Sequence, residues 1–428
     1  MAQSDNVPVR PTGYRWVVFA LLAAAYFMVY FHRTSPAVVA LDMMADLKAG
    51  GALMGLLGSA YFYPYALMQI PAGLLSDSWG PRKTITVFFL LAGAASILFG
   101  QVTGPGQAVA ARALVGLGVS MLFVPTMKIL TCWFRPSEFS RMMGLLMALG
   151  GVGALFSSAP LAYLSTILGW RGSFTVIGAL TFLLAGAIWI FVRNRPEDKG
   201  LPPVARPYPQ KETGPGISTW QGLKMVLTEK RFWPLAIWFF LGVSIFFAFG
   251  GLWGGPYLMQ IHGLSKPQAG NVLAMLFVGL IVGSPSLSWI SDKLLCSRKK
   301  VIVPSSGVLL ILTAVLAAFP ESIPLSLMYV WCFLLGVFGS AIVIIGFTTT
   351  KELFPLEIAG TSTGLVNLFP FMGGALLQVV VGFVLESGGR VSGVFTVQAY
   401  RMGFTVFLVS ATIAFVASLM IKETFKGE

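Results

Sequence analysis

Twelve long apolar runs limit what this chain can fold into. A helix needs about 20 mostly apolar residues to cross the hydrocarbon core of a bilayer. Runs of this kind cover residues 15–41, 52–75, 84–102, 107–131, 142–166, 173–193, 233–258, 268–291, 301–319, 324–349, 358–385 and 398–421. The sequence therefore predicts an all-α membrane protein with twelve transmembrane helices.

The composition agrees with this prediction. Of the 428 residues, 56% are hydrophobic and 11% are charged, whereas soluble domains average about 25% charged residues. The net charge of +13 comes from basic residues between the apolar runs, so it does not indicate a nucleic-acid-binding face. The three cysteines, Cys132, Cys296 and Cys332, are scattered and match neither a disulfide framework nor a zinc site. The polar N-terminal stretch lacks the pattern of a cleaved signal peptide, so the first run is expected to be retained.

The basic residues between the runs are distributed unequally over the two sides of the membrane. If the N-terminus is cytoplasmic, the outer connections hold only Lys48, Arg171, Lys266, Arg390 and Arg401. All the other basic residues outside the runs then lie on the inner side. By the positive-inside rule, both termini are expected in the cytoplasm, with the chain in a plasma membrane or a bacterial inner membrane.

The longest connection, residues 194–232, is rich in proline, glycine and charge, which is typical of a linker. It divides the chain into an N-terminal six-helix bundle (1–193), a cytoplasmic linker (194–232) and a C-terminal six-helix bundle (233–428). A related pattern occurs in each half: the second run ends in GLLSDSWGPRK (73–83), and the eighth ends in SWISDKLLCSRKK (288–300). Repeated halves of this kind are typical of transporters whose two bundles rock around a central site.

These stretches also resemble a known family. GLLSDSWGPRK resembles the loop motif between helices 2 and 3 of the major facilitator superfamily, and ARALVGLG (111–118) is similar to its helix 4 motif. GWRGSF (169–174) and ELFPLEIAGTSTGLVN (352–367) add to a resemblance that covers essentially the whole chain. The resemblance implies the major facilitator fold and a monomer. It also implies that Asp77, Arg82 and Asp292 latch the inner gate. The alternative is that they only determine topology.

Three basic residues lie well inside the runs: Arg33, Arg112 and Lys128. Such residues cost at least ~2.5–3.5 kcal/mol on insertion scales and usually face a cavity. No Asp or Glu lies well inside any run, so an anionic substrate is the simplest counter-ion. Two alternatives stay open: Arg112 can bond backbone carbonyls, and Lys128 can extend to the inner interface rather than line the substrate path.

The surroundings of Arg33 predict a binding site. Tyr26, Tyr30 and Arg33 share one helical face by their spacing. Tyr65 and Gln69 on the second run lie deep enough to join them. A guanidinium offers a two-pronged donor for a carboxylate or phosphate. The arrangement resembles the organic-anion and organophosphate branches of the superfamily, which implies that Arg33 binds the anion while the tyrosines line the path. The alternative is that the tyrosines only pack.

The seventh run, WFFLGVSIFFAFGGLWGGPYL (238–258), has no basic residue. The phosphate-ester branch of the family carries a second arginine in this helix. Its absence here favours a monoanion, a carboxylate or a zwitterion. Trp253 in this run is expected either to stack on the substrate or to pack within the bundle.

The energy source is less well defined. The sequence has no nucleotide-binding loop, and Val119 occupies the position where acidic relatives carry a membrane carboxylate. His32 is the one histidine within a run and is a possible proton-coupling site. Uniport and anion exchange fit the sequence equally well.

The sequence therefore predicts a secondary active or facilitative transporter of a small organic anion or zwitterion, embedded in membrane lipid. The alternative is an exporter of hydrophobic or cationic compounds. No enzyme, cofactor or metal is expected, because the runs contain no nucleophile–base pair and no cluster of metal ligands.

Overall fold

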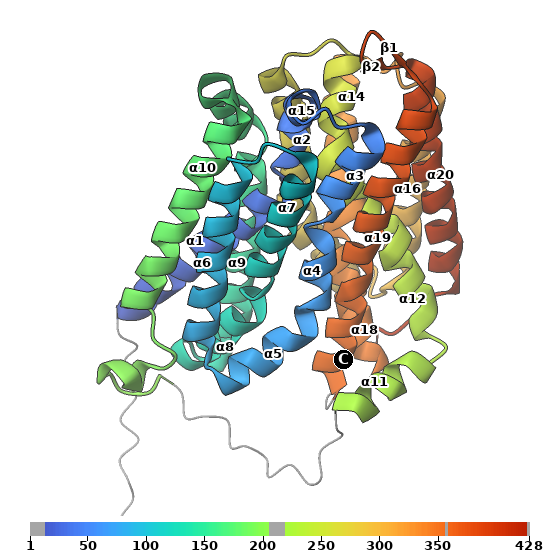
Figure 1. The fold of residues 1–428 in the computed structure, drawn as a ribbon. Helices are drawn as coiled ribbons and strands as arrows, with labels where there is room; N and C mark the ends of the chain where they lie inside the picture. Colours follow the sequence, from blue (N-terminus) through green and yellow to red (C-terminus); the bar gives the residue numbers. More distant parts are fainter. Residues whose placement is uncertain (1–12, 205–218, 356–357, 426–428) are drawn as a thin grey trace, which may run out of the picture.

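The computed structural model describes residues 13–204, 219–355 and 358–425. Long helices run between two opposite faces of the molecule (Figure 1). The start of the first helix, the segment 192–204 and the last described residues all lie toward one of these faces, which we call the linker face. The opposite face, which carries a small hairpin, is called the far face.

Ten α-helices lie within the described residues 13–204. They are α1 (Tyr14–Thr34), α2 (Pro36–Asp46), α3 (Gly51–Ser59), α4 (Phe62–Leu67), α5 (Gln69–Ser78), α6 (Pro81–Phe99), α7 (Pro105–Ser120), α8 (Phe123–Trp133), α9 (Pro136–Phe156) and α10 (Ala159–Phe191). We call them together the first bundle. The short helix η1 (Pro196–Lys199) and the surface helix α11 (Thr219–Thr228) follow.

The second half forms the second bundle. Its elements are α12 (Phe232–Trp238), η2 (Phe239–Val243), α13 (Ser244–Ala248), η3 (Phe249–Trp253), α14 (Gly254–Gln260), α15 (Lys266–Trp289), η4 (Ile290–Leu294), α16 (Lys299–Ala318), α17 (Leu325–Gly336), η5 (Val337–Ala341), α18 (Val343–Leu353), α19 (Ala359–Ser387), the hairpin β1 (Arg390–Val391) and β2 (Val394–Phe395), and α20 (Val397–Met420). The elements from α12 to α14 follow one another without a break and form a single crossing.

Ten helical segments among the described residues are long and apolar enough to cross a membrane. The two remaining predicted crossings are interrupted. The second run crosses as α3, α4 and α5, and the fifth breaks at Ser157 and Ser158, between α9 and α10. The helix α10 then turns sharply at Gly169, whose φ of 67° favours glycine, and continues as the sixth crossing. With these interruptions, the prediction of an all-α protein with twelve crossings is confirmed.

The outer surface of both bundles is apolar. Side chains such as Leu183 in α10 and Phe383 in α19 are strongly exposed. Large exposed apolar areas are unfavourable in water, and they are the expected surface of helices that face lipid.

The two bundles contact each other in the part of the molecule nearest the far face. Asp42 at the end of α2 forms an ion pair with Lys266 at the start of α15. The backbone N–H of Gly51 in α3 donates to the Glu386 carboxylate of α19, with an N–O distance of 2.5 Å. The helix α3 packs along α19, and α2 packs against η3 and α14. These contacts hold the far face closed.

A glycine permits the closest of these approaches. A Cβ atom at Gly255 in α14 would overlap the carbonyl oxygen of Ala37 in α2. Small residues allow helix backbones to come this close within a membrane. No larger residue fits at position 255 while the far face is closed.

Toward the linker face the bundles separate. On the linker side of Tyr65 and Phe371, the ion pairs Arg15–Glu138, Asp77–Lys128 and Arg298–Glu352 each lie within one bundle. The ribbons of α5 and α8 diverge from those of α18 and α11 in Figure 1. The structure is therefore closed at the far face and divided at the linker face. The domain limits at residues 193 and 232 stay predictions, and linker residues 205–218 lie outside the described residues.

Replacing Gly255 by valine is expected to prevent the far face from closing, since overpacking of this kind costs ~1–3 kcal/mol. The measurement is maleimide labelling of Val38→Cys, a buried far-face position beside Gly255, in protein whose native cysteines are replaced by serine. Labelling should rise in Gly255→Val. The control is Gly186→Val, where the added side chain meets open space. Unchanged labelling in Gly255→Val would contradict the role assigned to this contact.

Candidate substrate-binding site

Arg33 lies at the point where the two bundles meet. It is the penultimate residue of α1, and its side chain is buried. Four aromatic rings surround the guanidinium, with ring centres 4.5 Å (Tyr30), 4.8 Å (Tyr65), 4.9 Å (Phe371) and 5.9 Å (Phe247) from Cζ. Each contact of this type is worth ~0.5–2 kcal/mol, more where water is excluded. Two rings come from each bundle, so both bundles contact the same cation.

None of the acidic side chains that the structure describes balances this charge. Among the described residues Arg33 forms no ion pair, and its buried Nε has no hydrogen-bond partner. Aromatic rings stabilise a cation without neutralising it, and a buried charge without a counter-ion is costly. The site is therefore chemically complementary to a small anion.

The structure brings the predicted tyrosines together. The ring of Tyr26 is 5.3 Å from that of Tyr30, and the Tyr26 hydroxyl contacts Met147 Sδ at 3.4 Å. Tyr65 packs edge to face against Phe371, with centroids 4.7 Å apart. Tyr30 and Tyr65 thus contact Arg33 directly, and Tyr26 lies one ring further along. Whether they bind substrate stays a prediction.

Three aromatic residues at this site were not predicted from the sequence. Phe247 in α13 and Phe371 in α19 come from the second bundle, and nothing distinguishes one phenylalanine from another within an apolar run. Tyr61 stacks on Tyr65, with centroids 5.8 Å apart. It precedes Tyr65 by four residues, so helical spacing would have placed it on the same face.

Two predicted binding residues have their polar groups engaged elsewhere. Gln69 donates from Nε2 to the carbonyl oxygen of Tyr65 in its own chain segment, at 3.0 Å. Trp253 is fully buried near the far face, where its Nε1 donates to the carbonyl oxygen of Gln378 at 3.0 Å. Its ring lies next to Phe395 of the hairpin rather than in the group around Arg33. The structure does not bring Trp253 together with Arg33.

Arg112 and His32 contact each other inside the first bundle. Arg112 Nη1 donates to the carbonyl oxygen of His32 at 3.1 Å, which matches the structural alternative for Arg112. His32 Nε2 lies 2.9 Å from the Thr181 hydroxyl, which itself donates to the carbonyl oxygen of Ile177. His32 Nε2 and the Thr181 hydroxyl thus form a hydrogen bond whose direction is set by the imidazole tautomer. The imidazole is therefore directed toward α10 and not toward the rings around Arg33.

The first loop motif forms contacts within its own bundle. Asp77 at the end of α5 forms an ion pair with Lys128 of α8, and Lys128 also donates to the carbonyl oxygen of Ser76 at 3.2 Å. Arg82 lies over the ring of Trp189, 4.2 Å from Cζ to the ring centre. Both side chains of the Asp77–Lys128 pair are substantially exposed. In this arrangement Lys128 neutralises Asp77 at the linker face, well away from Arg33.

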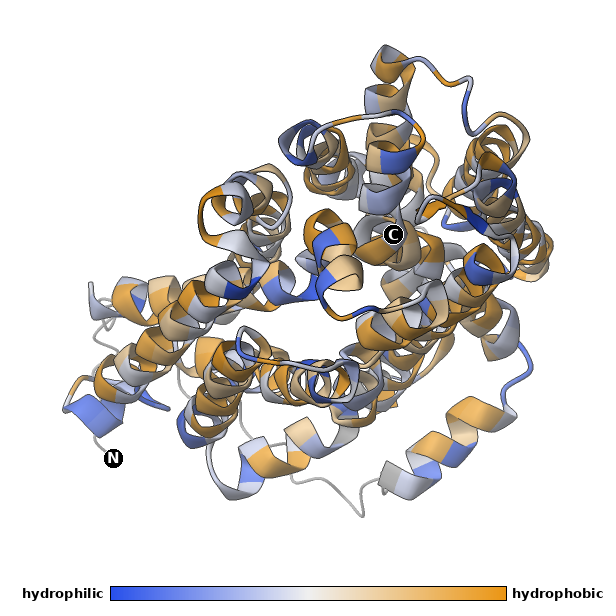
Figure 2. Ribbon diagram, turned by 45° about the horizontal axis from the view of Figure 1, so that its top comes forward, coloured by the Kyte–Doolittle hydropathy of each residue, from blue (hydrophilic) through white to orange (hydrophobic). Residues whose placement is uncertain are grey.

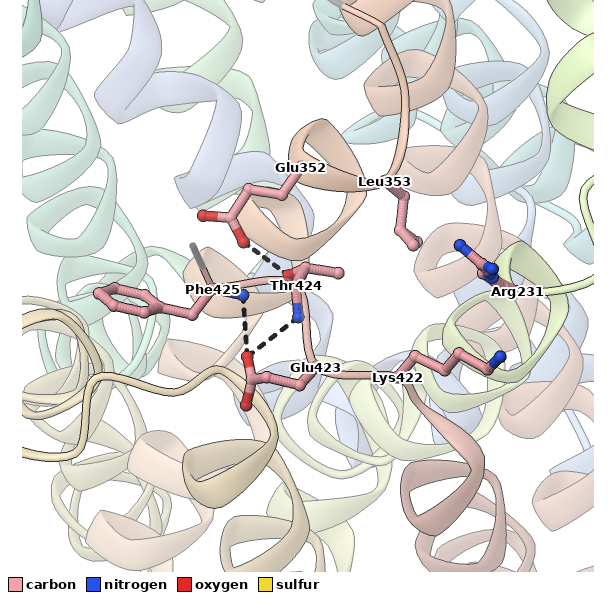
Figure 3. A pocket seen from close by; sticks show the side chains of 7 residues that line it. All are labelled: Arg231, Glu352, Leu353, Lys422, Glu423, Thr424 and Phe425. Atoms are coloured by element: carbon pink, nitrogen blue, oxygen red, sulfur yellow. Dashed lines mark hydrogen bonds between the residues drawn. The ribbon is translucent and has the colours of Figure 1, made fainter. Parts of the chain in front are cut away.

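The corresponding cluster of the second bundle includes the last described residues of the chain. Arg298 forms ion pairs with Asp292 and with Glu352, the latter at 2.9 Å. The Thr424 hydroxyl donates to Glu352 at 2.6 Å, and Figure 3 shows this bond next to Glu423. Asp292, like Asp77, is therefore paired within its own bundle.

The Glu423 carboxylate accepts hydrogen bonds at the start of α16. Backbone N–H groups of Arg298 and Lys299 donate to it at 3.0 and 3.2 Å, and the Ser297 hydroxyl donates as well. Partial burial raises the pKa of Glu423, but these bonds outweigh burial and lower the pKa to about 2. The carboxylate thus acts as a cap for α16 from a distant part of the chain.

Glu423→Gln is expected to lower the melting temperature at pH 7. The folded-state pKa lies below the ordinary value of 4.5, so this stabilisation is complete above about pH 4.5 and is lost as the pH falls toward 2. In thermal unfolding, the difference in melting temperature between wild type and Glu423→Gln should therefore narrow below pH 4.5. Glu321→Gln, which removes an exposed acid on the far side, is the control and should show no such narrowing. A difference in melting temperature that stays unchanged down to pH 3 would contradict the role of Glu423 as a cap for α16.

Among the described residues, no group of three or more His, Cys, Asp or Glu side chains is arranged to hold a metal ion. The polar groups around Arg33 are one guanidinium and several phenol hydroxyls. This donor set suits hydrogen bonding to an oxyanion.

Comparison with known proteins agrees with this geometry. The D-galactonate transporter of Escherichia coli O6:H1 (strain CFT073) is 24% identical over 407 residues, which cover 90% of this chain and 93% of the relative. The hexuronate transporter of Bacillus subtilis (strain 168) is 25% identical over 442 residues, covering 99% and 97%. The membrane sensor protein UhpC of Salmonella typhimurium (strain LT2) is 26% identical over 421 residues, covering 95% and 93%.

Solved structures share the fold. A bacterial homologue of the human lysosomal transporter Spinster, in an inward-facing and unoccupied conformation, superposes with a TM-score of 0.73 at 18% identity, covering 96% of this chain and 98% of the other. The nucleoside transporter NupG superposes with a TM-score of 0.74 at 15% identity, covering 95% and 99%. The family model of the Major Facilitator Superfamily matches residues 22–255 and 253–427. Since these matches span nearly the whole sequence, the chain belongs to the Major Facilitator Superfamily.

Proposed function

We propose that this protein is a secondary transporter of a small organic anion, and that its substrate is a sugar acid with a single carboxylate. The observation that carries the proposal is Arg33, a buried cation that both bundles contact and that none of the described acidic side chains balances. An anionic substrate would supply the missing charge. A site shared by two bundles is also where alternating access requires the substrate to sit.

Two observations favour a carboxylate over a phosphate ester. The seventh crossing contributes the phenyl ring of Phe247 near Arg33 and no second cation. A single guanidinium can bind one carboxylate through two parallel hydrogen bonds. The relatives named for D-galactonate and hexuronate transport point to the same class of compound. Export of cationic compounds has no observation in its favour, because the described residues around Arg33 contribute only a cation and neutral groups.

The closed far face fits one end state of the transport cycle. We place the linker face in the cytoplasm from the distribution of basic residues, so this state would admit substrate from the cytoplasmic side. Opening the far face requires breaking the Asp42–Lys266 ion pair and the Gly51–Glu386 hydrogen bond.

We further propose uniport or anion exchange rather than proton symport. The described residues that contact Arg33 include no Asp or Glu. The imidazole of His32 is fully buried against Thr181 and directed away from Arg33. Among the described side chains that contact the Arg33 guanidinium, none carries the carboxylate or imidazole that proton carriers ordinarily use.

Arg33→Lys is expected to weaken sugar-acid binding by about 10- to 150-fold, because hydrogen bonds to charged groups contribute ~1.5–3 kcal/mol and lysine lacks the two-pronged donor. The measurement is isothermal titration of purified protein with D-galactonate, D-glucuronate and glucose 6-phosphate. The control is Arg401→Lys, which affects an exposed far-face ion pair with Glu321. If all three anions bind Arg33→Lys as tightly as they bind wild type, the proposed function is overturned. Tighter binding of glucose 6-phosphate than of either sugar acid would overturn the assignment of a carboxylate.

In proteoliposomes, an imposed pH gradient is expected to drive no accumulation of sugar acid, whereas substrate loaded on the opposite side should produce counterflow. Labelled D-galactonate uptake measures both. Accumulation driven by the pH gradient would contradict uniport and exchange. Loss of that accumulation in His32→Gln would then identify His32 as the proton site.

A further inference from the structure

We propose that the linker-face notch between α11, α12 and α20 binds the headgroup of an anionic phospholipid. The notch is a pocket of about 470 Å³. Its lining residues are Thr228, Glu229, Lys230, Arg231, Pro234, Met420 and Lys422. It lies where the seventh crossing begins and the twelfth ends, and these two helices pack against each other.

The charges in this pocket are unbalanced. Among the described residues Lys230 and Lys422 form no ion pair. Arg231 has Glu229 as its one acidic partner, at a long 3.9 Å. The pocket therefore presents cations whose charge its single acid does not cancel, as a phosphate-binding site requires.

The nearby acids on the other side are already engaged. An adjoining pocket of about 360 Å³ shares Arg231 and Lys422 and contains Glu352 and Glu423. Glu352 is bound by Arg298 and Thr424, and Glu423 accepts backbone hydrogen bonds at α16. In Figure 3 the charged ends of Arg231 and Lys422 lie on one side of the pocket, and the carboxylates of Glu352 and Glu423 lie on the other. These two cations remain available to a ligand.

Apolar side chains extend from the same pocket along the lipid-facing surface. Met420, the last residue of α20, is 65% exposed, and Trp233 at the start of α12 is 42% exposed. Ile237 lies one turn further along the seventh crossing and is also exposed. A phosphate held by the lysines would thus have its acyl chains beside apolar side chains. A soluble anion would make no use of that surface.

The helix α11 places the pocket at the depth of lipid headgroups. Gly222 and Val226 are buried on one side of the helix, and a Cβ at Gly222 would contact Ile358 at 3.2 Å. Trp220, Lys224 and Leu227 follow one another at spacings of four and three residues, so they share the exposed side of the helix. Figure 2 shows this alternation of apolar and polar residues along the helix. Amphipathic helices of this composition lie in the plane of the membrane interface, where tryptophan is enriched.

The test uses the full-length protein in nanodiscs of phosphatidylcholine with increasing phosphatidylglycerol. The amount of phosphatidylglycerol that stays bound is measured by native mass spectrometry after the protein is released from the nanodiscs. The variant is Lys230→Gln with Lys422→Gln. The matched control is Lys224→Gln with Lys293→Gln, which removes two exposed lysines from the same face but outside the pocket. Neither pair contacts Arg33, so sugar-acid binding serves as a fold control in both.

The pocket variant is expected to retain about one fifth or less of the phosphatidylglycerol that wild type retains, since each lysine near a charged surface is worth ~1 kcal/mol. The control pair should retain the wild-type amount. Equal losses in both variants would overturn the proposal in favour of general surface charge. No loss in either would overturn it as well. Displacement of the lipid by millimolar inorganic phosphate would show a site for soluble anions and would also overturn it. All of these readouts are independent of the transported substrate.

Discussion

The uncompensated charge of Arg33 is the constraint on which the functional organisation of this protein depends. A guanidinium in the middle of a membrane protein needs stabilisation, and here aromatic rings from both bundles provide it. Because two of the rings belong to the opposite bundle, any rearrangement of the bundles changes the surroundings of this cation. A substrate anion and the protein's own rings therefore act on the same group. This is the physical link between occupancy of the site and the relative position of the two halves.

The two faces of the molecule use charged residues differently. At the far face, Asp42 and Lys266 connect one bundle to the other. At the linker face, Asp77 and Asp292 pair within their own bundles. Bonds between the bundles oppose their separation, whereas bonds within a bundle do not. The distribution of ion pairs thus matches a molecule that is closed at one face and divided at the other.

Much of the fold follows from the sequence, because the length of an apolar run is dictated by the thickness of the bilayer. The breaks within the second and fifth crossings do not, since their glycine, serine and proline residues also occur in unbroken crossings. Around Arg33, the positions of Tyr26, Tyr30 and Tyr65 could be predicted from helical spacing and depth. Phe247 and Phe371 could not, because a contact between bundles depends on how whole helices are placed relative to one another. Trp253 was predicted as a candidate ligand on residue type alone. The structure places it away from Arg33, because its position also depends on how whole helices are placed relative to one another.

The C-terminal segment has a practical consequence. Residues 422–425 look from the sequence like a disposable polar tail after the last crossing. In the structure, Glu423 accepts backbone hydrogen bonds at the start of α16, Thr424 bonds Glu352, and Phe425 lies over Arg298. A purification tag or fluorescent fusion joined directly after Met420 would remove all three contacts. Affinity handles on this protein should therefore follow Phe425, with a spacer long enough to leave these bonds undisturbed.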